Sequence, residues 1–150
     1  MIIIKTPTSR EDFKAYYALR YKVLSEPSGH PKGTEKDDYE PISEHFSAMD
    51  DRTGEILGVI KMFERSPGVA SFSHLAVAPD HQNRGIGKLL LRAVEKRAQE
   101  RGFKTLGAMS RVTATAYFEK QGYRVTEIPA PHLGMTHVVW LEKKLEGQAS

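Results

Sequence analysis

The sequence lacks cysteine altogether, which excludes a disulfide framework, a thiol nucleophile and a thiolate metal site. It also lacks any apolar run near the roughly 20 residues that are needed to span a bilayer. The apolar start at residues 1–4 is too short for a signal peptide and is better explained as a strand. We therefore expect no membrane association, and a cytoplasmic location fits these absences.

An excess of charge of one sign is missing as well, because 22 basic residues face 19 acidic ones and the formal net charge is only +3. Basic residues cluster at 96–97, 101, 104 and 143–144, but aromatic residues do not interleave with them as in motifs that bind RNA or DNA. A solvated helix face explains these clusters, so we expect no nucleic-acid partner. The six histidines show no metal-ligand spacing, and we expect no bound metal.

What is present is an ordinary globular composition of 150 residues, 39% hydrophobic and 27% charged. No repeat or long linker divides the chain, so we expect a single domain over residues 1–150. Hydrophobic periodicity and turn residues predict an α/β fold. The expected order is strand 1–5, a helix that begins at a capping box Thr8-x-x-Glu11, strands 45–49, 56–63 and 69–77, helix 86–101, strand 105–110, helix 113–121, and strands 123–128 and 137–143.

The most informative segment, Gln-Asn-Arg-Gly-Ile-Gly-Lys at residues 82–88, joins a predicted strand to a predicted helix. Unpaired N–H groups and the positive dipole end make a helix start an anion site. Gly85 and Gly87 carry no Cβ, so a phosphate group can approach the backbone closely. Two common phosphate loops are excluded: a P-loop needs glycine where Gln82 stands, and a Rossmann turn needs glycine where Leu90 stands.

A second motif, Ala-Thr-Ala-Tyr-Phe-Glu-Lys-Gln-Gly-Tyr, lies downstream at residues 114–123. Together with the Gln-x-x-Gly-x-Gly turn, it resembles the two sequence motifs of the GNAT-type N-acetyltransferase superfamily, and in the same order. The resemblance implies a mixed, mostly antiparallel central sheet flanked by helices, with acetyl-CoA as the cosubstrate. The alternative is an ordinary βαβ unit in which the glycines only make turns.

The resemblance also implies where acetyl-CoA binds. In the superfamily the central strand binds the pantetheine, the glycine turn binds the pyrophosphate, and the second motif packs beside the thiol. By position, the cofactor-binding residues are Leu75, Ala76, Val77, Gln82, Asn83, Arg84, Gly85, Ile86, Gly87, Lys88, Tyr117, Phe118 and Lys120.

The sequence departs from the family pattern where protons are transferred. Many members protonate the departing thiolate with a tyrosine, but Phe118 occupies that position. Arg111 replaces an asparagine that often binds the pantetheine, and Ser71 replaces a glutamate that serves some members as the base. Tyr117 cannot simply substitute for Phe118, because neighbouring side chains on a helix point about 100° apart.

Three residues remain as candidate catalytic groups, namely His74, Tyr117 and His132. His132 lies in the segment Ile-Pro-Ala-Pro-His-Leu-Gly-Met, which resembles the stretch before the last strand of ElaA-like members. Each candidate also has a structural explanation: His74 as a hydrogen-bonded histidine of the sheet, His132 as a residue that orders a loop, and Tyr117 as a packing residue.

By resemblance, the chain transfers an acetyl group from acetyl-CoA to an amine of a small molecule or peptide, as a monomer or a homodimer. The alternative is a domain that binds acyl-CoA or a metabolite with little or no catalysis, which the missing tyrosine supports. Residues 26–45 contain six acidic and two basic residues, and in the superfamily this region commonly walls the acceptor side of the cleft. An acidic wall favours a cationic acceptor; a solvated surface loop is the alternative.

Overall fold

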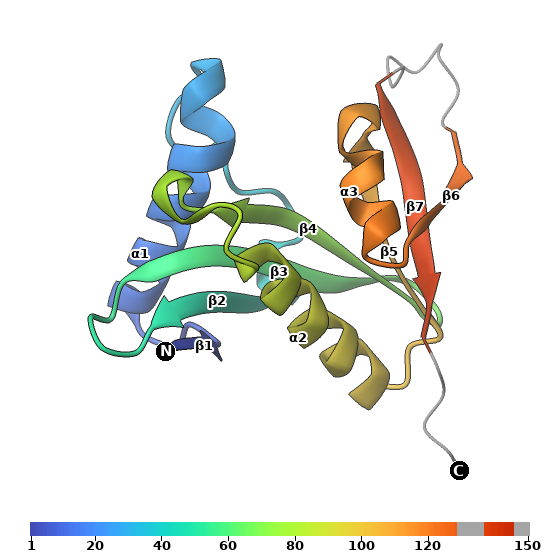
Figure 1. Cartoon of the computed structure of the whole chain (residues 1–150), viewed down its shortest axis with the longest axis horizontal. Coiled ribbons are helices and arrows are strands. Elements are labelled where there is room, and N and C mark those ends of the chain that lie inside the picture. The colour runs from blue at the N-terminus through green and yellow to red at the C-terminus, as the bar shows by residue number, and fades with distance from the viewer. Residues whose placement is uncertain (129–136, 146–150) are drawn as a thin grey trace. The chain divides into compact units, whose positions relative to one another are not determined.

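The computed structural model describes residues 1–128 and 137–145. Its strands form a sheet of the order β1-β2-β3-β4-β5-β7-β6, flanked by helices (Figure 1). The β4–β5 pair is parallel, whereas β1–β2, β2–β3, β5–β7 and β6–β7 pair antiparallel. This architecture confirms the α/β fold with a mostly antiparallel sheet.

The elements follow the predicted order with small shifts at their ends. Their bounds are β1 Ile2–Lys5, α1 Arg10–Arg20, β2 Glu44–Asp50, β3 Ile56–Ser66, β4 Val69–Val77, α2 Ile86–Glu100, β5 Thr105–Arg111, α3 Thr115–Lys120, β6 Arg124–Glu127 and β7 Val138–Lys144. Within these described ranges, no helix is both long enough and apolar enough to cross a membrane.

The chain divides into two compact units, residues 1–63 with 74–94 and residues 64–73 with 95–150. Strands β3 and β4 and helix α2 each contribute residues to both units. The first unit holds α1, β1, β2, β3 up to Phe63, the end of β4 and the start of α2.

Helix α1 begins with a capping box, but one residue later than the sequence predicted. The Ser9 hydroxyl accepts a hydrogen bond from the Asp12 backbone N–H at 3.0 Å, and the Asp12 carboxylate accepts the N–H of Ser9 at 3.3 Å. Asp12 also accepts the N–H of Thr8 at 3.1 Å. The proposed cap Thr8-x-x-Glu11 was therefore wrong, because an aspartate at the third helical position served as well as the expected glutamate.

In the first unit, α2 packs closely against β3 at Gly58. A Cβ atom at Gly58 would lie 2.9 Å from Ile86 Cγ2 and 2.9 Å from Leu90 Cδ1. Both side chains are fully buried in the first turns of α2. The absence of a side chain at Gly58 thus lets the start of the helix lie directly on the strand, which fixes the turn that precedes the helix.

The second unit is built on β5, which pairs with β7 along its whole length, Thr105–Arg111 against Val138–Lys144. Gly107 is required there, because a Cβ atom would lie 2.6 Å from the backbone oxygen of Leu141 and closer still to the Trp140 ring. The start of β4, Val69–Ser71, pairs in parallel with Thr105–Gly107. Helix α3 and the short edge strand β6 complete this unit.

Candidate functional site

The glycine turn predicted to hold phosphate lies in the first unit, between β4 and α2. Asn83 and Gly85 both adopt left-handed backbone conformations, with φ of 64° and 80°. The Gln82 side chain donates to the Val77 backbone oxygen at 3.3 Å, which ties the turn to the end of β4. The turn therefore leads directly into the first residue of α2, Ile86.

The start of α2 has the electrostatic character of an anion site. The helix is 15 residues long and carries no acidic residue in its first turn. A Cβ atom at Gly85 would meet nothing within 4 Å, so space is open beside the backbone at this point. Arg84 is an exposed residue of the turn, and its guanidinium lies 2.5 Å from His81 Nδ1. Unpaired N–H groups, the helix dipole and a nearby Arg are the features that bind phosphate.

The end of β4 carries three predicted cofactor-binding residues, Leu75, Ala76 and Val77, and the candidate catalytic residue His74. Ala76 is buried in a core cluster with Tyr16 and Val59. His74 has a φ of 56° in the middle of the strand, a conformation that residues other than glycine rarely adopt. Such strain persists only where the surrounding structure holds it, and it gathers at functional sites.

The second unit carries the remaining predicted residues on α3. Phe118 packs into an aromatic cluster, with its ring centroid 5.7 Å from that of Phe72 and 6.2 Å from that of Tyr123. Tyr117 is 41% exposed. Lys120 ends the helix, and His132 lies outside the described residues. The aromatic packing of Phe118 accounts for its side chain without any role in proton transfer.

A network of buried charges in the first unit was not predicted from the sequence. Glu40 accepts hydrogen bonds from Lys61 Nζ at 2.6 Å, Arg20 Nη1 at 2.7 Å, and the Tyr17 hydroxyl and Asp37 N–H at 3.0 Å. Arg20 and Lys61 are fully buried. Burial raises the pKa of Glu40, but the hydrogen bonds from Lys61 and Arg20 outweigh it and hold that pKa well below its ordinary value.

His45 and Tyr16 extend the network into the core. His45 Nδ1 lies 2.9 Å from the Tyr16 hydroxyl and Nε2 lies 3.1 Å from the Glu40 backbone oxygen. Burial lowers the pKa of His45, so its ring is neutral. The Glu40 carbonyl only accepts, so a neutral His45 donates Nε2–H to it and leaves Nδ1 as an acceptor. The single hydroxyl proton of Tyr16 is shared between Nδ1 and the Ile60 backbone oxygen, which lies 3.1 Å from the hydroxyl. Burial also raises the pKa of Tyr16, which keeps the hydroxyl protonated.

Asp37 connects this network to His74. One carboxylate oxygen of Asp37 forms an ion pair with Lys61, and the other lies 4.0 Å from His74 Nδ1. Burial, and then the charges of Arg20 and Lys61, lower the pKa of His74 to about 4, although Asp37 and Glu40 oppose the shift. His74 is therefore a neutral imidazole at physiological pH, and it borders the strand residues predicted to hold the cosubstrate.

Two buried cations therefore neutralise part of the negative charge of the acidic loop that was predicted to attract a cationic acceptor. Asp37 and Glu40 pair with Lys61 and Arg20, which lie outside residues 26–45. Glu35 is buried and accepts the N–H of Gly33 at 2.7 Å. One signal in the sequence could have revealed the network: Lys61 interrupts the otherwise apolar strand Ile56–Phe63, where a lysine needs a buried partner.

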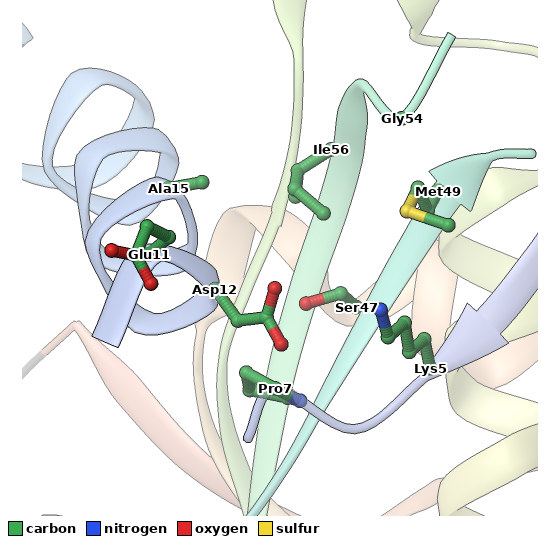
Figure 2. Close-up of a pocket in the computed structure, with 9 residues that line it drawn as sticks. All are labelled: Lys5, Pro7, Glu11, Asp12, Ala15, Ser47, Met49, Gly54 and Ile56. Carbon is green, nitrogen blue, oxygen red and sulfur yellow. The ribbon is translucent and has the colours of Figure 1, made fainter. Parts of the chain in front are cut away.

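A separate cavity of about 200 Å³ lies elsewhere in the first unit. Figure 2 shows the side chains of α1, β2 and β3 that surround it, together with Lys5 of β1. None of the predicted site residues lines this cavity, and Asp12, which does, completes the capping box of α1 with Ser9. The described residues contain no group of three or more His, Asp or Glu placed to hold a metal ion.

Comparison with known proteins identifies a family match over most of the chain. The sequence model of the acetyltransferase (GNAT) family matches residues 11–123. The uncharacterised N-acetyltransferase YjcF of Bacillus subtilis is 26% identical over 133 residues, which cover 85% of this chain and 93% of that protein.

Solved structures agree with this match. The crystal structure of a Lactobacillus plantarum protein that is designated an N-acetyltransferase is 27% identical, with a TM-score of 0.84 over 97% of this chain and 99% of that one. A GNAT family acetyltransferase of Elizabethkingia anophelis, with acetyl-CoA bound, has the same fold at 23% identity and a TM-score of 0.78, over 96% of this chain and 98% of that one.

Proposed function

Because the chain belongs to the acetyltransferase (GNAT) family and is an acetyl-CoA-dependent acyltransferase, we propose that it transfers an acetyl group to the nitrogen of an amine in a small molecule or peptide. The observation that supports this most directly is the left-handed turn at Asn83 and Gly85, which opens a 15-residue helix without an acidic first turn. A turn of this kind fits a pyrophosphate group.

The residues of the first unit are suited to hold acetyl-CoA, which supplies an acetyl group activated as a thioester. Backbone N–H groups at residues 82–88 bind the pyrophosphate, and the side chains of Arg84 and Lys88 add positive charge. The backbone of Leu75, Ala76 and Val77 binds the pantetheine arm. Tyr117, Phe118 and Lys120 belong to the second unit, and they stay predicted cofactor-binding residues by the resemblance of their motif alone.

An amine must lose a proton before or as it attacks, since a free alkylammonium has a pKa near 10.4. His74 is neutral at physiological pH and can accept a hydrogen bond or a proton from the amine. The low pKa of His74 makes it a weak base. We therefore propose that its main role is to orient the amine nitrogen and that proton transfer is its minor role. We expect the thiolate to depart without a tyrosine acid, because Phe118 cannot donate a proton.

A second candidate function follows from the same phenylalanine. The ring of Phe118 packs in an aromatic cluster with Phe72 and Tyr123, and this packing requires no hydroxyl group. A domain that binds acyl-CoA or senses a metabolite with little turnover is consistent with that packing. We also keep a cytoplasmic location as a prediction, and the choice between a monomer and a homodimer stays open.

Two measurements on the same protein distinguish these functions. Calorimetry gives the affinity for acetyl-CoA, and a thiol reagent gives the rate of CoA release with a panel of primary amines. We expect binding together with amine-dependent CoA release, and mass spectrometry should find the acetylated amine. Binding without amine-dependent release would favour the sensing domain, and absence of binding would overturn both assignments.

A further inference from the structure

In the first unit Asp37 contacts both Tyr39, through the backbone N–H, and the region of His74, and all three residues are partly open to solvent. The exposed fractions of the side chains are 36% for Asp37 and 24% for His74, and Tyr39 is 47% exposed. Building on the proposed function, we propose that these three residues form the acceptor subsite, and that the acceptor is a monoamine with a planar apolar body.

The gap between Asp37 and His74 has the size of one bridging nitrogen. Asp37 Oδ2 and His74 Nδ1 are 4.0 Å apart, too far for a direct hydrogen bond. A nitrogen placed about 2.9 Å from each atom spans this gap, because 4.0 Å is less than twice that length. A carboxylate oxygen accepts hydrogen bonds, and a neutral imidazole accepts at its unprotonated nitrogen, which is Nδ1 in the Nε2–H tautomer. In that tautomer the pair suits an amine that brings two N–H donors.

The second carboxylate oxygen of Asp37 is already committed. Its Oδ1 accepts the backbone N–H of Tyr39 at 2.9 Å and the ammonium of Lys61. In the described part of the chain no hydrogen bond to Oδ2 is formed, which leaves that oxygen for a ligand. The contacts at Oδ1 fix the carboxylate, so it does not need to reorganise when an amine binds.

The aromatic surface beside Asp37 indicates what the amine carries. The Tyr39 ring stacks on Phe63 with a centroid distance of 4.4 Å and an interplanar angle of 16°. Lys61 Nζ, the partner of Asp37, lies 6.0 Å from the Tyr39 ring and 5.7 Å from the Phe63 ring. The exposed face of Tyr39 can therefore stack a planar group attached to an amine bound at Asp37.

Charge near the subsite favours one amine over several. Arg20 and Lys61 carry two positive charges, and Asp37 and Glu40 carry two negative ones, so the buried network is neutral as a whole. His74 adds no charge at physiological pH. The network thus offers Asp37 Oδ2 to a single ammonium, and its zero net charge gives a second ammonium no added attraction. We therefore narrow the cationic acceptor expected from the acidic loop to a monoamine.

Position on the strand relates the subsite to the cosubstrate. His74 is followed directly by Leu75, Ala76 and Val77, the residues proposed to bind the pantetheine arm. An amine held at His74 therefore borders the proposed cosubstrate site within the same unit.

The test uses phenethylamine as the probe, with butylamine and spermidine for comparison, on the full-length protein. Calorimetry in the presence of saturating CoA measures amine binding, and CoA release from acetyl-CoA measures turnover. Two variants target the subsite, Asp37→Asn and Tyr39→Ala. Asp38→Asn is the control for the charge change, and Ile42→Ala, at a position that is 63% exposed in the same loop, is the control for the lost apolar surface.

We expect phenethylamine to bind better than butylamine and spermidine, by about tenfold for the loss of a stacked ring. Asp37→Asn and Tyr39→Ala should each weaken phenethylamine binding by a similar factor, whereas Asp38→Asn and Ile42→Ala should leave it unchanged. Tyr39→Phe should retain binding, because the ring rather than the hydroxyl is required. Thermal melting of each variant checks that the fold is intact.

Three results would overturn the subsite: a preference for spermidine, equal effects of Asp37→Asn and Asp38→Asn, or equal effects of Tyr39→Ala and Ile42→Ala. Failure of the subsite and failure of the proposed function give different signatures. Binding that depends on Asp37 and Tyr39 without CoA release supports the subsite and removes the enzymatic function. Turnover of amines that neither Asp37→Asn nor Tyr39→Ala changes supports the enzymatic function and removes the subsite.

Discussion

Lys61 and Glu40 form an ion pair in the interior of the first unit, with Nζ and Oε2 2.6 Å apart and the lysine side chain fully buried. Arg20 shares the same carboxylate at 2.7 Å. One acidic side chain therefore balances two buried cations, with Asp37 assisting at Lys61.

The first prediction concerns the loss of that carboxylate. Glu40→Gln keeps the shape but leaves Arg20 and Lys61 with less compensating charge, and we expect the free energy of unfolding to fall by about 3–5 kcal/mol. Urea denaturation measures this loss. Glu26→Gln makes the same chemical change at an exposed position and should shift stability by less than about 0.5 kcal/mol. Similar midpoints for the two variants would show that the network is energetically unimportant.

The pH dependence of stability should carry the signature of His74. Its pKa is lowered to about 4 in the folded protein, against about 6.5 when unfolded. Between these values the unfolded chain binds more protons, so stability is full above about pH 6.5 and falls as the pH drops towards 4. We expect His74→Gln to flatten this part of the stability curve. An unchanged slope would mean that His74 titrates normally in the folded protein.

Acetyl-CoA binding should depend on Gly87. Gly87→Glu places a carboxylate in the first turn of α2, where it opposes a phosphate group, and the affinity for acetyl-CoA should fall about tenfold or more. Glutamate is a better helix former than glycine, so the helix itself should not suffer. Lys96→Glu, at an exposed position further along α2, makes a larger change of net charge and serves as the control in calorimetry. Equal affinities of the two variants would argue against a phosphate site at the turn.

The roles of the two aromatic residues on α3 can be separated by exchange. Phe118→Tyr should be tolerated and should preserve or raise turnover. The new hydroxyl would supply the proton donor for the thiolate that the resemblance to the superfamily leads one to expect at this position. Tyr117→Phe should change the rate by less than about twofold, because the exposed Tyr117 is assigned no acid role. Steady-state kinetics with the best amine measures both. A hundredfold loss in Tyr117→Phe with unchanged melting would identify Tyr117 as the acid.

Gly58 should influence the cosubstrate site from a distance. Gly58→Ala forces a methyl group into contact with Ile86 and Leu90, and we expect a loss of about 1–3 kcal/mol of stability together with weaker acetyl-CoA binding. Leu90→Ala removes one of the opposing atoms at its own cost. If the clash is the cause, the double variant will be more stable than the sum of the two single effects predicts. Additive losses of stability would instead indicate that Gly58→Ala acts through the backbone of β3 and not through the clash.

Much of the fold could be predicted because its signals are local. Alternating apolar residues, the glycine turn and helical spacing fixed the order of elements, and the turn at residues 82–88 does precede a helix. The capping box was misplaced by one residue because two overlapping patterns, starting at Thr8 and at Ser9, both satisfy the rule.

The buried charge network could not be predicted in the same way. Its members come from α1, the loop before β2 and β3, and they are brought together only by the fold. Asp37 and Glu40 were counted with a solvent-exposed acidic loop, because a carboxylate has no sequence signature for a distant partner. The sequence also contains no signal for the left-handed backbone conformation of His74, because a histidine in an apolar strand predicts an ordinary extended residue.

The position of Glu40 has a consequence for how the connection between α1 and β2 is ordered. This carboxylate joins the connection near its end to α1 through Arg20 and Tyr17, and to β3 through Lys61. These contacts divide the long connection into shorter segments, and closing each shorter segment costs less chain entropy. Ion pairs thus help to order the segment that carries Asp37 and Tyr39. Because the ion pairs of Glu40 with Arg20 and Lys61 are shielded from solvent, added salt should loosen that segment far less than it would a surface loop tied by exposed charges.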